Sequence, residues 1–222
     1  MKSILITGAT SGIGKALATH AANQGYRVIA CGRNEETLNE LSRYSNIEAC
    51  QFDVTDLEDA RRALATVKFD IAVLNAGTCE YVDIDSFEPD MFRRVFEPNF
   101  FGVVHCVDAL LPRFKKGDKL VIVDSMARLL PFTKTQAYGS SKAALHYFTK
   151  SLEVDLHEKG VKVQAVSPGF VETPLTDKND FEMPMKISAE EAAEAMLKGI
   201  ESNKQSVFFP RAFGFILRLM HV

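Results

Sequence analysis

The stretch TGATSGIG, residues 7–14, decides the fold of this chain. It contains Gly8, Gly12 and Gly14 but no charged residue, and it follows a short apolar run that is typical of a buried strand. Residues 13–21 then repeat apolar side chains with the period of an amphipathic helix. Glycine loses more conformational freedom on folding than any other residue, so three glycines this close together indicate a demand on the backbone. They are expected in a tight turn from the first strand to the first helix.

Strand and helix patterns alternate along the rest of the chain. Further apolar runs typical of buried strands are RVIAC, EACQF, DIAVLN, KLVIVDS, VKVQAV and QSVFF. Helices are predicted after Asn34 and after a capping pair of Thr55 and Glu58. Two longer helical regions are predicted over residues 89–116, with a bend at Pro98, and over residues 136–159. A further helix is predicted from a capping box of Ser188 and Glu191 to about residue 200, and a last one after Pro210. This alternation predicts an α/β fold, a Rossmann-like, doubly wound, parallel seven-stranded sheet with helices on both faces. We find no internal repeat or linker and expect one domain over residues 1–222.

The composition excludes several classes of protein. A formal net charge of −3 leaves no basic face for a nucleic-acid partner. The cysteines lack metal-type or redox-type spacing, so we expect no metal site and free thiols at Cys31, Cys50, Cys79 and Cys106. The chain has no pattern of a secretory signal and no run of about 18 apolar residues that would cross a membrane. A cytoplasmic protein is therefore expected.

The position of the glycine turn predicts its ligand. In a doubly wound sheet, the turn after the first strand lies where the strand order reverses, and ligands bind at that point. Glycines there let a pyrophosphate reach the backbone amides and the positive end of the following helix. An ordinary tight turn is the alternative, but a position between a strand and a helix favours a nucleotide.

The spacing T-G-x-x-x-G-x-G resembles the cofactor motif of the classical short-chain dehydrogenase/reductase family. Over about residues 3–175, further marks similar to that family occur in its order: NAG at Asn75, Ala76 and Gly77, then Asn99, Ser125, Tyr138 and Lys142 in YGSSK, and SPGFVET at residues 167–173. The resemblance implies an oxidoreductase that transfers a hydride between a nicotinamide cofactor and a small carbonyl or secondary-alcohol substrate.

The chemistry of the central residues agrees with that expectation. Tyr138 and Lys142 are one helical turn apart and share a helix face. A free tyrosine has a pKa of about 10, and a nearby ammonium and a positive nicotinamide are expected to lower it. Tyr138 is then the general acid or base, and Ser125 donates a hydrogen bond to the reacting oxygen. The resemblance further implies that Lys142 holds the nicotinamide ribose and that Asn99 positions water in a proton relay.

The end of the second predicted strand favours NADP(H) over NAD(H). An NAD site usually has an acidic residue there, whereas this strand ends in Ala30, Cys31 and Gly32 with Arg33 beyond it. A guanidinium binds a phosphate such as the 2′-phosphate of NADP through paired hydrogen bonds. A merely solvated Arg33 is the alternative.

The resemblance extends the cofactor site along the chain. Asp53, followed by Val54, is similar to the family's contact to adenine, although Asp53 also suits the cap of the next helix. Thr173 is similar to its contact to the nicotinamide carboxamide. The predicted cofactor-binding residues are Gly8, Thr10, Ser11, Gly12, Ile13, Gly14, Arg33, Asp53, Val54, Asn75, Ala76, Gly77, Tyr138, Lys142, Pro168, Gly169, Val171 and Thr173.

Two segments are expected to shape the substrate site, because loops carry specificity in this architecture. The first is a short loop at about residues 174–187, where Phe181, Met183 and Met185 suit either a small lid over an apolar substrate or ordinary packing. The second is the C-terminal segment 205–222.

Residues 211–220 of the C-terminal segment suggest a short amphipathic helix. Phe213, Leu217 and Met220 share one side of it, and two arginines share another. The pattern suits peripheral membrane contact through these residues, a contact with another subunit or a flap over the active site.

The helix predicted over residues 136–159 is apolar on two sides. One side carries Leu145, Phe148 and Leu152, and the other carries Ala144, Tyr147, Ser151 and Val154. Such a helix is usually buried on both sides, which predicts a homodimer or homotetramer.

Two features carry no functional prediction. Asp124 stands directly before Ser125, where many relatives have a small polar residue. We expect packing or surface roles, away from any carboxylate, for the histidines His20, His105, His146, His157 and His221.

Two other functions would share the glycine turn. A redox sensor that binds NADP(H) without turnover needs Arg33 but has no use for Ser125, Tyr138 and Lys142 at these spacings. An epimerase or dehydratase of nucleotide sugars needs a larger C-terminal substrate region. The sequence therefore favours the oxidoreductase.

Overall fold

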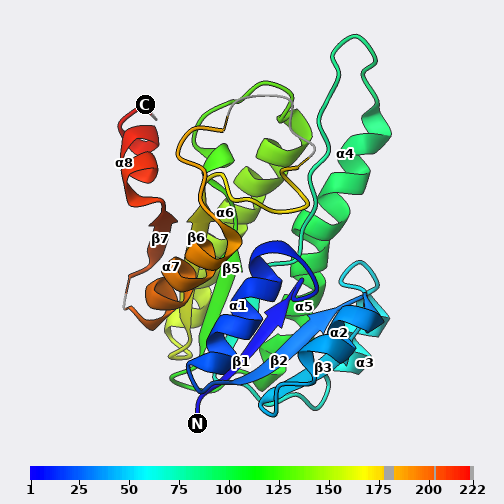
Figure 1. Ribbon diagram of the computed structural model, residues 1–222, viewed down its shortest axis with the longest axis vertical. Coiled ribbons are helices and arrows are strands. Elements are labelled where there is room, and N and C mark those ends of the chain that lie inside the picture. Colours follow the sequence, from blue (N-terminus) through cyan, green and yellow to red (C-terminus); the bar gives the residue numbers. More distant parts are fainter. Residues whose placement is uncertain (178–182, 203, 221–222) are drawn as a thin grey trace.

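The computed structural model describes residues 1–177, 183–202 and 204–220. Within them, seven parallel strands form one sheet in the order β3-β2-β1-β4-β5-β6-β7 (Figure 1). The strands are β1 (Ser3–Thr7), β2 (Arg27–Gly32), β3 (Ile47–Gln51), β4 (Ile71–Leu74), β5 (Lys119–Val123), β6 (Lys162–Pro168) and β7 (Ser206–Phe209). The predicted doubly wound fold is confirmed.

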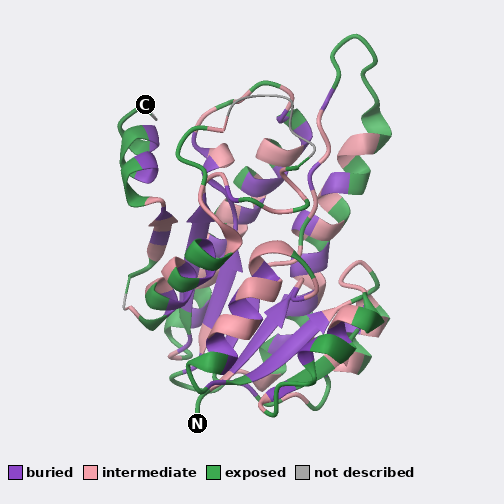
Figure 2. Ribbon diagram, viewed as in Figure 1, coloured by how far each residue is buried: buried purple, intermediate pink, exposed green. Residues whose placement is uncertain are grey.

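Helices cover both faces of this sheet. The α-helices of the described residues are α1 (Gly12–Asn23), α2 (Glu35–Leu41), α3 (Leu57–Leu64), α4 (Pro89–Phe96), α5 (Gly102–Leu110), α6 (Gln136–His157), α7 (Ala189–Glu201) and α8 (Arg211–Met220), and α4 packs on α6 rather than on the sheet. Side chains alternate across a strand, so Ile4 and Ile6 of β1 pack with α1, α2 and α7, whereas Leu5 packs with α3, α5 and α6. The hydrophobic cores on the two faces bury every residue of β1, β4 and β5 except Ser3 and Lys119, the first residues of β1 and β5 (Figure 2).

The long helical region is interrupted at Pro98, as predicted. Proline has no backbone N–H to continue the helical ladder, and a single π-helical turn, Glu97–Phe101, separates α4 from α5. A short 3-10 turn, Leu111–Arg113, then ends the region. The π-helical turn contains Asn99, which is completely buried.

Of the two predicted capping boxes, the one formed by Thr55 and Glu58 is wrong. The start of α3 is capped by Asp56, whose carboxylate accepts a hydrogen bond from the Asp59 amide at 2.9 Å. Thr55 instead donates to the Asp53 carboxylate at 2.8 Å, so neither Thr55 nor Asp53 caps the helix. A carboxylate one residue closer to the helix reaches the orphan amides better. The capping box of Ser188 and Glu191 at the start of α7 is confirmed.

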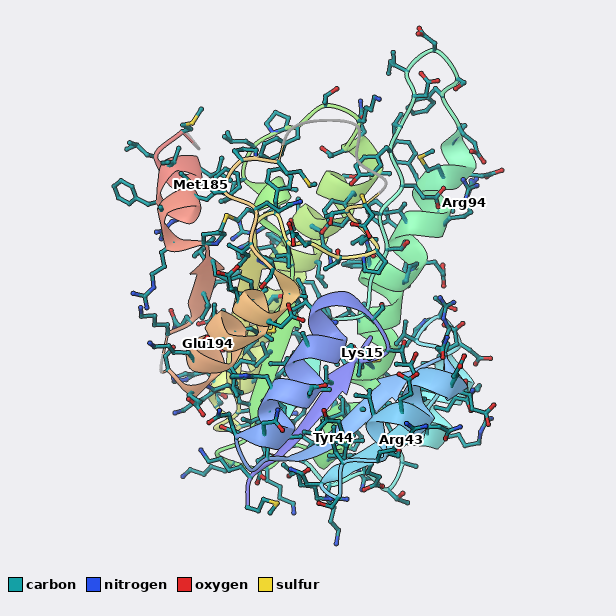
Figure 3. All side chains as sticks on the ribbon, viewed as in Figure 1. Lys15, Arg43, Tyr44, Arg94, Met185 and Glu194 are labelled. Carbon is teal, nitrogen blue, oxygen red and sulfur yellow. The ribbon has the colours of Figure 1, made fainter. Side chains whose placement is uncertain are left out.

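Most charged side chains of the helices lie on their outer faces (Figure 3), and Lys142 of α6 is a buried exception. Arg94 of α4 pairs with Glu88 at 2.6 Å and with Glu80 at 2.8 Å, which connects the segment before α4 to that helix. On α6, Tyr147 and Val154 are 79% and 73% exposed. Both side chains belong to the second apolar side of α6, the side expected to contact another subunit. The homodimer or homotetramer itself stays a prediction.

Replacing the α3 cap tests the corrected start of that helix. We expect Asp56→Ala to cost about 1 kcal/mol and to lower the thermal midpoint by about 2–4 °C in a chain of this length. Thermal unfolding followed by circular dichroism measures the shift. Glu58→Ala, in the first turn of the same helix, removes a surface ion pair with Arg61 and an acidic side chain but not the cap, and it serves as control with an expected cost of about 0.5 kcal/mol. Equal losses in the two variants would contradict the assignment.

Candidate active site

The glycine turn after β1 is shaped by close backbone contacts. Gly8 and Gly12 have φ angles of +67° and +48°, which side chains other than glycine rarely adopt. A Cβ atom on Gly14 would lie 2.1 Å from the Gly8 carbonyl oxygen, and one on Gly8 would lie 2.8 Å from the Cα of Ala76. Ser11 precedes α1 without a side-chain cap, so the first amides of the helix face the turn. These features fit an anionic group held by backbone amides.

Three adjoining cavities run along the carboxyl ends of the strands. The first, of about 280 Å³, borders the glycine turn and the segment after β4. The second, of about 100 Å³, shares Asn75 and Thr173 with the first and reaches Lys142. The third, of about 70 Å³, shares Ser125 and Tyr138 with the second and is walled mainly by apolar side chains. The predicted catalytic side chains therefore stand between a polar groove and an apolar pocket.

Tyr138 and Lys142 lie in the first turns of α6, beside the end of β5. The Lys142 ammonium donates to the Val123 carbonyl at 3.0 Å and lies 5.9 Å from the centre of the Tyr138 ring. Burial lowers the pKa of Lys142 to about 8, although the Asp124 carboxylate opposes this shift. Lys142 is thus a buried cation whose charge is sensitive to mildly alkaline pH.

Of the two influences expected to lower the Tyr138 pKa, the Lys142 ammonium does not outweigh burial in this structure. Burial raises the pKa of Tyr138 well above its usual value, and a hydrogen bond with Ser125 offsets only part of this rise. Desolvation disfavours the charged phenolate, while the Lys142 ammonium is held by a backbone carbonyl. Tyr138 is accordingly a phenol at neutral pH, which suits a proton donor.

Asn99 connects the segment after β4 to α6. Its amide nitrogen donates to the Thr78 carbonyl at 2.9 Å and to the Ser141 hydroxyl at 3.0 Å, and its amide oxygen accepts from the Thr78 amide at 2.7 Å. A Cβ on Gly77 would lie 2.8 Å from the same oxygen. The relay role predicted for Asn99 stays a prediction.

The segment after β4 is also anchored to β1. The Thr7 hydroxyl accepts from the amides of Asn75 and Ala76 at 3.0 and 3.1 Å. The Asn75 side chain donates to the Thr7 carbonyl at 3.1 Å. These bonds hold the predicted residues Asn75, Ala76 and Gly77 against the glycine turn.

The segment after β6 closes the groove from the other side. The Gly169 amide donates to the Phe209 carbonyl at 2.8 Å, and Val171 is buried and bridged to Ile187. The Thr173 methyl lies 3.1 Å from where a Cβ on Gly12 would stand. With Pro168 lining the second cavity, the predicted residues of this segment face the glycine turn. Phe181 of the predicted loop lies outside the described residues.

Arg33 and its neighbours stand apart from these cavities. The Arg33 side chain is 75% exposed and pairs with Asp53 at 3.3 Å. Partial burial raises the pKa of Asp53, but hydrogen bonds from Thr55 and the Arg33 guanidinium outweigh it, and the net shift is downward. Val54 packs against Gly102, and Thr10 packs against Gly32 at the end of β2. Such an exposed pair is weak, so Arg33 is available to a ligand.

Known proteins share this arrangement. The family model for short chain dehydrogenases matches residues 2–183. The chain belongs to the short-chain dehydrogenase/reductase family. An uncharacterized oxidoreductase of Staphylococcus epidermidis is 36% identical over 206 residues, covering 88% of this chain and 89% of that protein. The serine 3-dehydrogenase of Rhizobium radiobacter is 34% identical, covering 89% of this chain and 81% of that enzyme.

A solved structure agrees with the family assignment. The closed form of a serine dehydrogenase complexed with NADP⁺ superimposes with a TM-score of 0.82 at 25% identity, covering 93% of this chain and 94% of that one. The protein is therefore a short-chain dehydrogenase/reductase, an oxidoreductase of the class that acts on CH–OH groups with NAD(P).

A buried carboxylate behind the site was not anticipated from the sequence of this dehydrogenase. Asp124 is 2% exposed and accepts hydrogen bonds from Arg128 Nε at 2.9 Å and from the Ser167 hydroxyl. Its Oδ2 atom also lies 2.7 Å from His146 Nδ1, so the expectation that no histidine meets a carboxylate is wrong for His146. The three partners come from a 3-10 turn, β6 and α6, which sequence spacing does not bring together. The Asp124 charge raises the pKa of both Lys142 and Tyr138.

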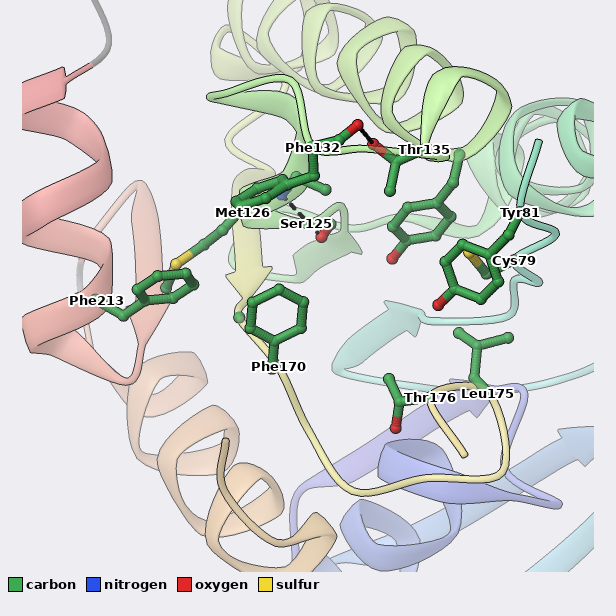
Figure 4. A pocket seen from close by; sticks show the side chains of 13 residues that line it. Cys79, Tyr81, Ser125, Met126, Phe132, Thr135, Phe170, Leu175, Thr176 and Phe213 are labelled. Carbon is green, nitrogen blue, oxygen red and sulfur yellow. Dashed lines mark hydrogen bonds between the residues drawn. The ribbon is translucent and has the colours of Figure 1, made fainter. Parts of the chain in front are cut away.

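The apolar wall of the third cavity was also largely missed. It includes Cys79, Tyr81, Met126, Phe132, Phe170, Leu175 and Phe213, from segments far apart in the chain (Figure 4). The cavity borders α8 through Phe213, which is buried together with Leu217. Met220, expected on the same side of that helix, is 59% exposed, because α8 meets the fold mainly along Phe213, Gly214 and Leu217. The membrane and subunit contacts of residues 211–220 stay predictions.

Two absences hold for the described residues alone. No group of three or more His, Cys, Asp and Glu side chains is arranged there to hold a metal ion. Over the same stretches, no helix has the length and apolar character needed to cross a membrane. Each cysteine is a free thiol, as predicted.

Neutralising Asp124 tests its influence on the site. In Asp124→Asn the pKa of Lys142 falls, because a carboxylate that stabilises the ammonium is lost. We therefore expect the alkaline fall in oxidoreductase activity to lie at lower pH than in the unmodified enzyme. A pH profile of kcat/KM measures this shift. Asp118→Asn, which changes another buried carboxyl near the opposite end of β5, should leave the profile in place. Identical profiles for Asp124→Asn and the unmodified enzyme would contradict the prediction.

Proposed function

We propose that this dehydrogenase transfers a hydride between NADP(H) and the carbonyl or secondary alcohol of a small molecule, with Tyr138 exchanging the proton. The observation that carries the proposal is the position of Ser125 and Tyr138 in the walls of two cavities at once, one reaching toward the glycine turn and one apolar. A nicotinamide in the first and a carbonyl compound in the second would meet at these two side chains.

Each side chain of the site has a distinct task in this proposal. When bound, the cofactor supplies or accepts the hydride. In reduction, Tyr138 gives its phenolic proton to the oxygen of the substrate, and its raised pKa keeps that proton in place at neutral pH. Ser125 donates a hydrogen bond to the same oxygen as negative charge develops on it. The Lys142 ammonium holds the ribose of the cofactor and adds positive charge beside the phenol.

Further parts of the proposal concern the cofactor cradle. The glycine turn and the exposed amides at the start of α1 receive the pyrophosphate. Thr173 contacts the carboxamide, Asp53 and Val54 lie at the adenine end, and Asn99 positions a relay water. The preference for NADP(H) rests on Arg33, which is exposed and has no acidic residue before it on β2. The serine dehydrogenase structure complexed with NADP⁺ supports the same preference.

Removing the phenol hydroxyl tests the catalytic assignment. We expect Tyr138→Phe to lower kcat by about 10²–10⁴-fold, because the proton donor is lost. NADPH binding, measured by quenching or enhancement of its fluorescence, should change little. Tyr147→Phe, which alters an exposed tyrosine on the same helix, is the matched control. Normal turnover by Tyr138→Phe would show that another group moves the proton.

Removing the Arg33 guanidinium tests the cofactor preference. Since a hydrogen bond to a charged group contributes about 1.5–3 kcal/mol, Arg33→Ala should weaken NADPH binding about 10- to 100-fold and NADH binding less than about 2-fold. Titration calorimetry with each cofactor gives the ratio. Arg27→Ala, at the opposite end of β2, should alter neither affinity. A loss of equal size for both cofactors would refute the role of Arg33.

A further inference from the structure

The third cavity is walled by aromatic and aliphatic side chains on the side away from the cofactor groove. The rings of Phe132 and Phe170 meet edge to face with centroids 5.9 Å apart, and Phe170 and Phe213 meet at 5.7 Å. Met126 completes this side, whereas Leu175 closes the cavity toward the first and second cavities, which it also lines (Figure 4). These residues belong to four separate segments, which converge only in the folded chain.

Polar groups in this wall are engaged within the protein. The Thr135 hydroxyl donates to the Phe132 carbonyl at 2.8 Å, and the Thr176 hydroxyl donates to the Val171 carbonyl at 2.6 Å. Burial raises the pKa of the Cys79 thiol to about 11, so this group is neutral at physiological pH. Among the described residues that line the cavity, none carries a charged side chain.

The position of α8 is set by two close contacts. A Cβ on Gly169 would lie 2.9 Å from the Phe213 ring, and a Cβ on Gly214 would lie 2.8 Å from the Cβ of Phe208 and 3.1 Å from the Met126 methyl. These two glycines let the helix approach β7 and the loop after β6 closely enough for Phe213 to reach the cavity. Phe215, two residues further on, is 63% exposed and is not among the residues that line the cavity.

We propose that the substrate carries an uncharged, apolar group next to its carbonyl, and that Phe213 of α8 limits the size of this group. The inference rests on the proposed function, because Ser125 and Tyr138 supply the reacting end of the same cavity. A volume of about 70 Å³ accommodates roughly five to seven water-sized groups, which corresponds to a branched alkyl chain or a small ring.

The relative named serine 3-dehydrogenase provides a contrast. Serine carries a carboxylate and an ammonium, and burying a charge without a partner costs several kcal/mol. Among the described residues, the apolar wall offers no such partner, so we expect a substrate that differs in charge from serine. A site that cannot pair a charge rejects a charged analogue far more strongly than it rejects a change in size.

A pair of ketones of equal size tests the substrate class. Both 5-methylhexan-2-one and 4-oxopentanoate are methyl ketones. The first ends in an isopropyl group, and the second carries a carboxylate in the same position. With NADPH and the full chain, we expect kcat/KM at least about 100-fold higher for the neutral ketone, the discrimination that an unpaired buried charge imposes. Equal or better turnover of 4-oxopentanoate, or oxidation of L-serine in preference to neutral alcohols, would overturn the proposal.

Variants of α8 test the role of Phe213. Phe213→Ala removes the contact between the phenyl ring and the substrate, so kcat/KM for 5-methylhexan-2-one should fall about 10- to 100-fold. The larger 4-phenylbutan-2-one should lose less, because the pocket is enlarged. The ratio of kcat/KM for the smaller ketone to kcat/KM for the larger one should therefore drop. Phe215→Ala, on the exposed side, should leave both values unchanged. Phe213→Leu provides a milder change if the alanine variant does not fold. An unchanged ratio in a folded Phe213 variant would remove α8 from the proposal.

A binding measurement separates this inference from the proposed function. Saturation-transfer NMR with NADP⁺ present reports each ketone directly, without turnover. If no carbonyl compound is reduced but the neutral ketone binds and Phe213→Ala weakens it, the proposed function fails and the apolar pocket stands. If reduction proceeds but the charged ketone binds as well as the neutral one, the pocket proposal fails alone. Binding of neither ketone overturns the pocket proposal.

Discussion

The contact of Gly14 with the Gly8 carbonyl is the constraint on which the rest of this structure depends. No side chain fits between them, because a Cβ would lie 2.1 Å from that oxygen. The contact brings the start of α1 down onto the end of β1, and the first helical amides consequently face the groove. The same turn receives the segment after β4, where Gly8 approaches the backbone of Ala76. A groove for a dinucleotide thus arises from backbone packing before any side chain contributes chemistry.

The order of the strands extends this local contact into a site. β1 lies between β2 and β4, so the chain runs outward in one direction up to β3 and in the other from β4 to β7. Ligands bind in open α/β sheets where this order reverses, at the carboxyl ends of the strands. The ends of β4, β5 and β6 accordingly deliver the segments that hold Asn75, Ser125 and Gly169. The π-helical turn at Pro98 and the interior amide of Asn99 then tie one of these segments to α6.

Burial governs the electrostatics at the centre of the site. Tyr138 and Lys142 are removed from water together, so desolvation favours the neutral form of each, moving one pKa up and the other down. Asp124 acts against this on the lysine, and its own charge is matched by Arg128 and the Ser167 hydroxyl. A buried carboxylate is tolerated only when such partners are present. Asp124 and its partners therefore influence the charge of Lys142 and Tyr138, although they do not touch the reacting atoms.

The sequence alone determined the strand–helix alternation, the glycine turn and the nearness of Tyr138 to Lys142, because each of these rests on local spacing: period 2 or 3.6, a strand-to-helix junction, or one helical turn. It also indicated the free thiols and the break at Pro98. It misplaced the α3 cap, where Asp56 competes with Thr55 within a single turn. It did not indicate that burial raises the Tyr138 pKa, because the degree of burial depends on tertiary packing and not on local spacing. Only the tertiary structure decided that His146, Arg128 and Ser167 surround Asp124, and that Phe213 reaches across from α8 to Phe170. These groups are far apart along the chain, and no periodicity records which of them the crossovers of a parallel sheet bring together.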